Sequence, residues 1–306
     1  MDPDVMEGRR RPDLSVTIAS FNTCAVLDRC IASLHAHRGS LDMEVIVVDN
    51  GSSDDSARMV AGRWPGVRLI VNDRNRYLTG AQNQAIAAAG GRYLLILNSD
   101  MEVVDGTLPS MVEWMDAHPL TGAASCVEVL HGRPKAPLLF QTPREAILRR
   151  TWLRRLSPSR PDHFVNPAHE SGQVEAEVIS DAFMVVRREA LLGIGGFDES
   201  LKLYYTEDDI CMRLHRAGWQ VHFVASATVI HIGDGSHSVN TVGRLRILWI
   251  NYRDTWRYFH KHFGPAAGLV VYAVFLAQFA LHDAPRALKK RMSGLLRNRP
   301  KPREVS

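Results

Sequence analysis

The sequence predicts an α/β protein with a mixed, mostly parallel central sheet flanked by helices. Three observations support this fold class. Apolar runs of strand length occur without the alternation that is typical of a half-solvated sheet. Segments with helical periodicity separate these runs. Most runs also end in polar residues, and in open parallel sheets ligands bind beyond the carboxyl ends of the strands.

Alternating strands and helices fill the first hundred residues. The expected strands are residues 14–21, 43–50, 67–73 and 92–100, and the expected helices are residues 25–37, 56–63 and 79–89. Polar side chains at the strand ends gather along one edge of the predicted sheet: Ser20, Asn22, Asp49, Asn50, Asn98, Ser99 and Asp100.

The pattern is less regular after about residue 105. The second half predicts, in order, a helix (108–118), a strand (122–129), a Pro- and Arg-rich insertion (131–172), a strand followed by a helix (175–191), a loop (195–209), one or two strands (219–233) and a long helical region from residue 241 onward. The chain shows no internal repeat.

The charge of the chain is mild overall but unevenly distributed. The formal net charge is +4, and the hydrophobic content of 45% is ordinary for a globular protein. Eight Arg or Lys and one acid lie between Arg133 and Arg160, and eight more with no acid lie between Arg286 and Arg303. Such patches indicate either a polyanion or anionic membrane partner, or a solvated basic face.

The remaining composition favours a cytoplasmic protein. The four cysteines have no CxxC or metal-ligand spacing, which is typical of free thiols in a reducing compartment. The N-terminal residues lack the apolar core of a signal peptide. The uncharged segment 266–281 has 16 residues and would reach about 24 Å as a helix, which is too short to span a membrane.

Two strand-to-turn junctions offer ligands for a nucleotide and a metal ion. In VVDNGSSDDS, Asp49 can accept hydrogen bonds from a nucleobase or ribose, although an ordinary capped turn is the alternative. LLILNSDME delivers Asp100 to the same edge, where Mg²⁺ or Mn²⁺ prefers oxygen ligands. The chain has no GxGxxG dinucleotide loop and no GxxxxGK[ST] phosphate loop, which disfavours NAD and ATP folds.

The second half adds a histidine and a carboxylate triplet. His231 ends a predicted strand beside a glycine-containing loop and is either structural or a ligand of metal or phosphate. Glu207, Asp208 and Asp209 open a helix. They fit a plain helix start, in which Thr206 and Asp209 resemble a capping box, and they also fit a general base.

The ordered motifs resemble those of a family 2 inverting glycosyltransferase, and more narrowly the rhamnosyltransferase-like branch. They run SFN, VVDNGSSDDS, N-x-x-x-x-G-x-x-N, LNSD, GGFDE, TEDD, RAGW and H-x-x-x-x-S over about residues 14–240. The resemblance implies a GT-A fold. It divides the chain into a flexible N-terminus (1–12), a catalytic domain (13–240) and a helical, apolar and basic C-terminal extension (241–306). Within the domain it implies a nucleotide-binding half (13–105) and an acceptor half (106–240).

The resemblance also implies a role for each matching position. Asp208 matches the general base, with Glu207 and Asp209 as alternatives because the triplet lacks the spacer of the commoner ED-x-D pattern. Asp100 matches the metal-binding aspartate of the DxD element, and His231 matches the histidine that assists the diphosphate or metal. The nucleotide-binding residues it implies are Ser20, Asn22, Asp49, Asn83 and Asn98. The residues it implies for the acceptor site or its support are Gly196, Phe197, Arg213 and Trp219.

This chain departs from the family pattern at several positions. Tyr77 and Ala85 replace two glycines, Gln82 replaces an Asn, and Asp181 replaces a glycine before the strand FMVVR. The donor sugar and the acceptor therefore stay open, with rhamnose carried by dTDP or UDP as the expectation from the resemblance.

The resulting hypothesis is a metal-assisted transfer of sugar, with inversion, from a nucleotide-diphospho-sugar to a glycan or polyprenyl-diphosphate-linked acceptor. Mg²⁺ or Mn²⁺ on Asp100 would neutralise the leaving diphosphate, and Asp208 would deprotonate the acceptor. We expect peripheral contact with the inner face of the cell membrane through segment 266–281 and no nucleic acid partner. Packing of that segment on the body or in a homodimer is the alternative. The rival functions are a nucleotidyltransferase and a non-catalytic sugar-nucleotide-binding scaffold.

Overall fold

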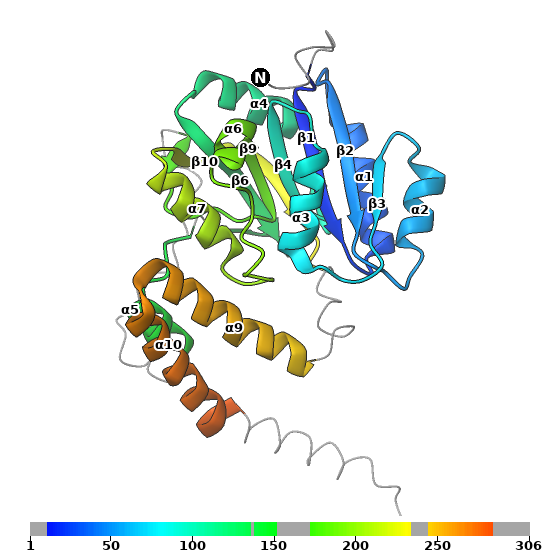
Figure 1. Ribbon diagram of the computed structural model, residues 1–306. Helices are drawn as coiled ribbons and strands as arrows, with labels where there is room; N and C mark the ends of the chain where they lie inside the picture. Colours follow the sequence, from blue (N-terminus) through cyan, green and yellow to red (C-terminus); the bar gives the residue numbers. More distant parts are fainter. Residues whose placement is uncertain (1–10, 136–137, 152–171, 234–243, 284–306) are drawn as a thin grey trace, which may run out of the picture. The chain divides into compact units, whose positions relative to one another are not determined.

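The computed structural model describes residues 11–135, 138–151, 172–233 and 244–283, and the chain divides into two compact units (Figure 1). Unit 1 comprises Met1–Phe140 and Pro161–Asp254, and unit 2 comprises Gln141–Arg160 and Thr255–Ser306. The expected domain boundary at residue 240 lies outside the described residues, and the division between the units falls later, after Asp254.

A single mixed sheet forms the centre of unit 1. The order of its main strands is β3-β2-β1-β4-β9-β6-β10-β5, while β7 pairs with β6 and β8 pairs with β10. Strands β3, β2, β1 and β4 are parallel, β9 runs antiparallel between β4 and β6, and β6 and β10 are again parallel. The strands are β1 Leu14–Ser20, β2 Met43–Asp49, β3 Arg68–Val71, β4 Tyr93–Asn98, β5 Met101–Val103, β6 Thr121–Leu130, β7 Arg133–Lys135, β8 Gln173–Glu175, β9 Phe183–Arg187 and β10 Gln220–His231.

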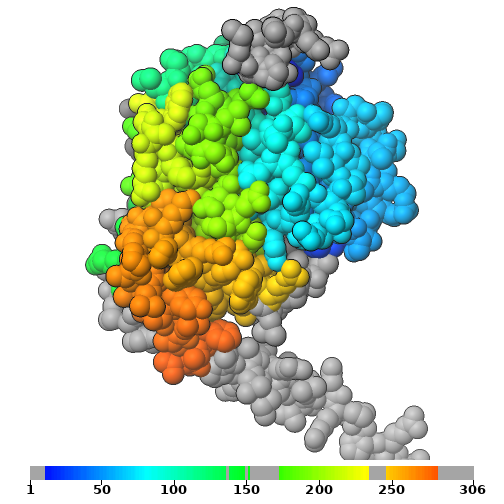
Figure 2. Space-filling view, in the orientation of Figure 1, coloured from blue at the N-terminus to red at the C-terminus, as the bar shows by residue number. Residues whose placement is uncertain are grey.

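Helices cover both faces of this sheet, which explains why its strands are apolar throughout. One buried cluster joins the sheet to α1, α2 and α4, and a second joins it to α3, α6 and α7. In Figure 2 the atoms of α3 and of the α6–α7 region cover the second face. The helices of unit 1 are α1 Cys24–Ala36, α2 Ser56–Arg63, α3 Tyr77–Ala88, α4 Thr107–Ala117, α6 Arg188–Gly193, α7 Thr206–Arg216 and the first part of α9 Arg244–Phe263.

The periodicity of α1 shows why the sequence forms these helices. Leu27, Cys30, Ile31 and Leu34 follow a spacing of three or four residues and are fully buried against the sheet. Each such side chain contributes roughly 1.5–3 kcal/mol to folding when it is fully removed from water.

Unit 2 is helical in its described part. It contains α5 Pro143–Arg150, the second part of α9, α10 Pro265–Gln278 and a π-helical turn over Phe279–Asp283. Thr142 and Glu145 form a capping box at the start of α5. A Cβ atom on Gly268 would lie 2.9 Å from the backbone nitrogen of His260, so this glycine allows α10 to approach α9 closely. The rest of the expected basic insertion and the basic tail lie outside the described residues.

Candidate active site

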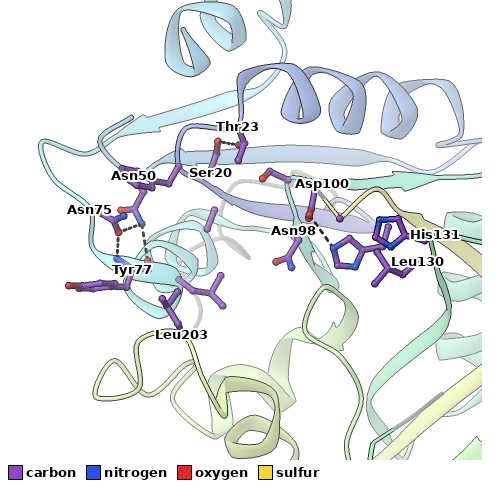
Figure 3. A pocket seen from close by; sticks show the side chains of 16 residues that line it. Ser20, Thr23, Asn50, Asn75, Tyr77, Asn98, Asp100, Leu130, His131 and Leu203 are labelled. Atoms are coloured by element: carbon purple, nitrogen blue, oxygen red, sulfur yellow. Dashed lines mark hydrogen bonds and ion pairs between the residues drawn. The ribbon is translucent and has the colours of Figure 1, made fainter. Parts of the chain in front are cut away.

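A pocket of about 470 Å³ opens in unit 1 at the carboxyl ends of β1 and β4 (Figure 3). This is the edge where the sequence predicted polar residues to gather. The expected site residues that line the pocket are Ser20, Asn98, Asp100 and His231. Asn50, Asn75, Tyr77, His131 and Leu203 also line it, and none of these was among the predicted site residues.

Asp49 lies at the end of β2 and is buried, with 2% of its surface exposed. One carboxylate oxygen accepts a hydrogen bond from the Ser52 backbone N–H at 3.0 Å. The other oxygen, Oδ1, is buried and has no hydrogen-bond partner among the described residues. A buried acceptor without a partner is costly, so this oxygen is suited to a donor group that a ligand supplies.

Asn22 has a different environment from the one expected of a nucleotide ligand. Its backbone is left-handed, with φ 56°, and its Oδ1 accepts hydrogen bonds from the backbone N–H of Ser53 at 2.7 Å and of Asp54 at 3.3 Å. Its backbone N–H donates to Ser52 Oγ at 2.9 Å. Asn22 therefore ties the turn after β2 to the end of β1, and it is not a pocket-lining residue.

Asn50 organises the turn that enters α3. Its Nδ2 donates to Asn75 Oδ1 at 3.1 Å and to the Tyr77 carbonyl at 2.9 Å, while its Oδ1 accepts from the Arg76 N–H at 2.8 Å. Tyr77 itself is left-handed, with φ 63°. These bonds hold Tyr77 in a conformation that is uncommon for a residue with a side chain, at a position where the family pattern has glycine.

Asp100 and His231 form the acidic and imidazole pair of the pocket. His231 Nε2 lies 3.1 Å from Asp100 Oδ2, and His231 Nδ1 donates to Glu128, which also accepts from Lys135. Burial alone would lower the pKa of His231, but the hydrogen bonds and charges of Asp100 and Glu128 outweigh it and raise the pKa to about 9. Glu128 was not predicted, because it precedes His231 by more than a hundred residues and meets it only through the pairing of β6 with β10.

This pair fits a divalent cation whose other ligands come from the substrate. Among the described residues, no cluster of three or more His, Cys, Asp or Glu side chains could hold a metal ion by itself. A carboxylate and an imidazole nevertheless suit Mn²⁺, and Mg²⁺ usually takes one or two carboxylates and keeps phosphate oxygens and waters as its other ligands. The hydrogen bond that His231 Nδ1 donates to Glu128 also orients the ring as metal sites require.

The carboxylate triplet begins α7, but the expected cap is absent. The residue before the helix is Tyr205, with φ 62°, and no side chain caps the helix. Thr206 is the first helical residue, and its hydroxyl donates to Asp181 Oδ2 at 2.7 Å. The capping box predicted for Thr206 and Asp209 is therefore wrong. The Thr206 hydroxyl donates instead to Asp181, a contact that the local sequence pattern does not predict.

The three carboxylates of the triplet have different environments. Asp209 is 1% exposed and forms an ion pair with Arg213, whose Nη2 lies 2.6 Å from its Oδ2. Glu207 Oε2 lies 3.1 Å from the Thr206 hydroxyl. Asp208 is 3% exposed. Arg213 also donates to the Ile194 carbonyl at 2.8 Å, so its described contacts are with Asp209 and the preceding loop.

Asp181 lies beside the triplet, at a position where the family pattern has glycine. Burial raises the pKa of this carboxyl group to about 7, and the charge of Glu207 adds to the effect.

The loop over residues 195–205 is fastened to its surroundings by side chains from α3 and α9. Asn83 accepts from the Phe197 N–H and donates to the Phe197 carbonyl, both at 2.9 Å. Gly196 has φ 70°, and a Cβ atom there would lie 2.8 Å from Asn83 Oδ1. The oxygen and the nitrogen of the Asn83 amide thus both bond to the loop, whereas a nucleotide contact was expected. Phe197 is buried in the core.

Asp254 of α9 is the other anchor of this loop. It is fully buried, and its Oδ2 accepts hydrogen bonds from the N–H groups of Lys202, Leu203 and Tyr204 at 2.8, 2.9 and 3.2 Å. Because Leu203 lines the pocket and Tyr205 precedes α7, Asp254 fixes a pocket wall together with the entry to the triplet. No local pattern indicated this role, since Asp254 lies in the region expected to be a separate extension.

Trp219 packs at the start of β10. A Cβ atom on Gly122 would lie 2.7 Å from the Cβ of Trp219, and the indole lies against the core cluster of α7. Trp219 is not a pocket-lining residue.

Comparisons with solved structures identify the fold. The structure of GalNAc-T7 with UDP, GalNAc and Mn²⁺ aligns with a TM-score of 0.55 and 17% identity over 73% of this chain and 44% of that chain. The Pyrobaculum calidifontis mannosyltransferase PcManGT with GDP-Man and Mn²⁺ aligns with a TM-score of 0.54 and 18% identity over 94% of this chain and 81% of that chain. The fold is GT-A, as the sequence predicted.

Sequence comparisons then give the family. The family model described as glycosyl transferase family 2 matches residues 15–157. An N-acetylglucosaminyl-diphospho-decaprenol L-rhamnosyltransferase of Mycobacterium tuberculosis is 26% identical over 76% of this chain and 78% of its own length. The succinoglycan biosynthesis protein ExoO of Rhizobium meliloti is 39% identical over 38% of this chain and 33% of its own length. Residues 15–157 thus match a family 2 glycosyltransferase domain, which confirms the resemblance drawn from the motifs.

Proposed function

We propose that this enzyme transfers a sugar, with inversion, from a nucleotide-diphospho-sugar to a hydroxyl of a lipid-linked glycan during cell-surface polysaccharide synthesis. The observation that carries the proposal is the pocket at the strand ends. The Asp100–His231 pair and the strand ends of the nucleotide half line this one cavity. The loop over residues 195–205, which leads to the triplet, forms part of the cavity wall. A nucleotidyltransferase remains the weaker alternative, because the N-terminal turn SFNTCAV has no basic, glycine-rich phosphate loop.

The names of the relatives support the substrate classes. The M. tuberculosis relative is named as acting on a diphospho-decaprenol-linked sugar, and a Campylobacter jejuni relative, 28% identical over 33% of this chain, as acting on a diphospho-undecaprenol-linked glycan. We therefore assign a polyprenyl-diphosphate-linked acceptor and, from the first relative, a rhamnosyl donor carried by dTDP or UDP. In this assignment Asp49 Oδ1 accepts a hydrogen bond from the base or ribose.

Asp100 and His231 would hold Mg²⁺ or Mn²⁺. When it is bound, such an ion neutralises the negative charge that develops on the leaving diphosphate. The residues of the chain then have separate tasks. Asp100 and His231 position the diphosphate end of the donor, while Glu128 and Lys135 keep the His231 ring in place.

Asp208 is the residue we assign as general base. Asp208 stands at the position that matches the general base of the family motif, whereas Asp209 forms an ion pair with Arg213 and Glu207 contacts the Thr206 hydroxyl. The N-terminus of α7 favours the ionised carboxylate, the form that a base requires. A positioned base typically contributes about 10²- to 10⁴-fold to the rate, so positioning and charge stabilisation must supply the rest.

The donor and metal assignments predict that nucleotide binding depends on the metal. Thermal stabilisation of the wild type by free nucleoside diphosphates should be larger with Mn²⁺ than without it, because a ligand that binds only the folded state raises its stability. Asp100→Asn should remove the increment due to Mn²⁺ and keep the smaller effect of the nucleotide alone. Asp105→Asn, on an exposed residue, is the control. An unchanged Mn²⁺ increment in Asp100→Asn would remove Asp100 from the metal site.

We further propose peripheral contact with the inner face of the cell membrane through α10. No helix within the described residues is both long enough and apolar enough to span a membrane. Leu269, Val270 and Leu276 are nevertheless 63%, 53% and 42% exposed on α10, and no charged residue occurs from Gly264 to Leu281. The sequence that follows has eight Arg or Lys and no acid between Arg286 and Arg303. An apolar helix followed by basic residues suits an anionic lipid surface.

A further inference from the structure

Two cationic side chains meet the same aromatic ring at the pocket. Lys202 Nζ lies 5.5 Å from the centre of the Tyr77 ring, and Arg246 Cζ lies 5.6 Å from it. Arg246 also donates two hydrogen bonds to the Tyr77 hydroxyl, from Nε at 3.1 Å and from Nη2 at 2.7 Å. The three residues come from three separate elements of unit 1: the start of α3, the loop over residues 195–205, and α9.

Hydrogen bonds hold the backbones of two of the three residues, Tyr77 and Lys202. The Tyr77 backbone is bonded to Asn75 and Asn50, at 2.7 and 2.9 Å. The Lys202 N–H donates to the fully buried Asp254 at 2.8 Å, and Asp254 lies two turns after Arg246 on α9. The fold therefore fixes the backbones of Tyr77 and Lys202, and the exposed Arg246 side chain is hydrogen-bonded to the Tyr77 hydroxyl.

The chemistry of this cluster is that of an anion site. Lys202 and Arg246 place two positive charges beside one ring, and both charges attract a bound anion. Among the described residues, no carboxylate forms an ion pair with Arg246. The guanidinium offers its remaining N–H groups, and the Tyr77 hydroxyl accepts from Arg246 and so keeps its own proton to donate. A diphosphate, with several acceptor oxygens and high charge, matches these donors.

We propose that Tyr77, Lys202 and Arg246 bind the diphosphate group of the lipid-linked acceptor; this rests on the proposed function. Two placements favour the acceptor over the donor. Figure 3 shows Tyr77 at one end of the pocket and Asp100, the proposed metal ligand for the donor, at the other. The loop that carries Lys202 also runs directly into α7 and Asp208, where the acceptor hydroxyl must arrive.

The test is equilibrium binding of farnesyl diphosphate, a short polyprenyl diphosphate, to the full chain. Calorimetry would compare the wild type with a double variant, Lys202→Gln with Arg246→Gln. The matched control, Arg38→Gln with Arg58→Gln, changes the net charge equally on exposed residues outside the pocket. We expect the double variant to bind farnesyl diphosphate at least about tenfold more weakly, since two charge-assisted contacts are lost. Tyr77→Phe, which keeps the ring, should have a smaller effect.

Two further ligands separate the sources of the phosphate. Farnesol lacks the diphosphate and should bind the wild type and the double variant equally. UDP and dTDP with Mn²⁺ should bind both within about twofold. Unchanged affinity for farnesyl diphosphate would overturn the proposal, and an equal loss of nucleotide affinity would assign the cluster to the donor instead.

Transfer from a nucleotide sugar by the wild type is measured in parallel. Its absence with every donor would refute the proposed function. Its presence, together with unchanged binding of farnesyl diphosphate in the double variant, would refute only the acceptor site.

Discussion

Asp181 shows how a single substitution alters the site. It stands where the family pattern has glycine, and it adds a carboxyl group next to Glu207 and the Thr206 hydroxyl. Two carboxylates that share one hydroxyl group repel each other when both are ionised. The raised pKa of Asp181, about 7, records this repulsion together with the burial of the group.

Asp181 should therefore make the stability of the protein depend on pH. Its pKa in the folded state lies above the ordinary value of 3.8, so folding favours the protonated form. The stability that it contributes is present below about pH 4 and is lost as the pH rises towards 7. Asp181→Asn keeps an acceptor for Thr206 but cannot ionise. We expect this variant to be more stable than the wild type by at least about 1 kcal/mol at pH 8, with little of this gain at pH 4.

Urea denaturation of both proteins at the two pH values measures this difference. Asp105→Asn, whose side chain is 98% exposed, controls for loss of a surface charge. A stability difference between Asp181→Asn and the wild type that is the same at pH 4 and pH 8 would contradict the account.

Residues at strand ends could be predicted from the sequence, and residues held by long-range contacts could not. Asp100 and His231 each end an apolar strand, so the sheet alone brings them to the pocket edge. Asn83 and Asp254 lie on helices and bond to the loop over residues 195–205, which depends on packing that no local pattern records.

At the scale of elements, the strands were the best predicted. All of the first four expected strands contain the observed ones and differ from them by at most two residues at either end, because a buried parallel strand is a nearly continuous apolar run. The start of α7 was predicted, but its cap was not, since Asp181 captures the Thr206 hydroxyl. The first part of α9 was expected in an extension and instead belongs to unit 1.

The exposed face of α10 predicts binding to anionic lipid. Leu269→Glu should lower the affinity for vesicles of phosphatidylglycerol and phosphatidylethanolamine by about tenfold. A smaller fraction of the variant should then float with the vesicles. The reason is that burying a leucine in an apolar environment contributes roughly 1.5–3 kcal/mol, and a carboxylate is also repelled by the anionic surface.

Leu120→Glu is the matched control, because Leu120 is 66% exposed and lies in unit 1. Equal flotation of Leu269→Glu and the wild type would show that α10 does not contact lipid. A change from dimer to monomer in Leu269→Glu, with flotation retained, would support the alternative in which α10 pairs two copies of the chain.

At the scale of the whole molecule, the proposed chemistry spans more of the chain than the family match. The match ends at residue 157, within which lie Asp49 and Asp100. The triplet, His231 and the helix that carries Asp254 all follow it. The nucleotide half thus lies within the family match. The residues that would select and activate the acceptor lie after the match ends.

The central claim is that Asp208 activates the acceptor in a transfer reaction. The most direct measurement compares turnover and donor binding in the wild type, Asp208→Asn and the neighbouring Glu207→Gln, with the sugar nucleotide that the wild type uses. The account predicts that Asp208→Asn loses about 10²- to 10⁴-fold in turnover, binds the donor nearly as tightly as the wild type, and is more impaired than Glu207→Gln. Turnover of Asp208→Asn close to that of the wild type would contradict it.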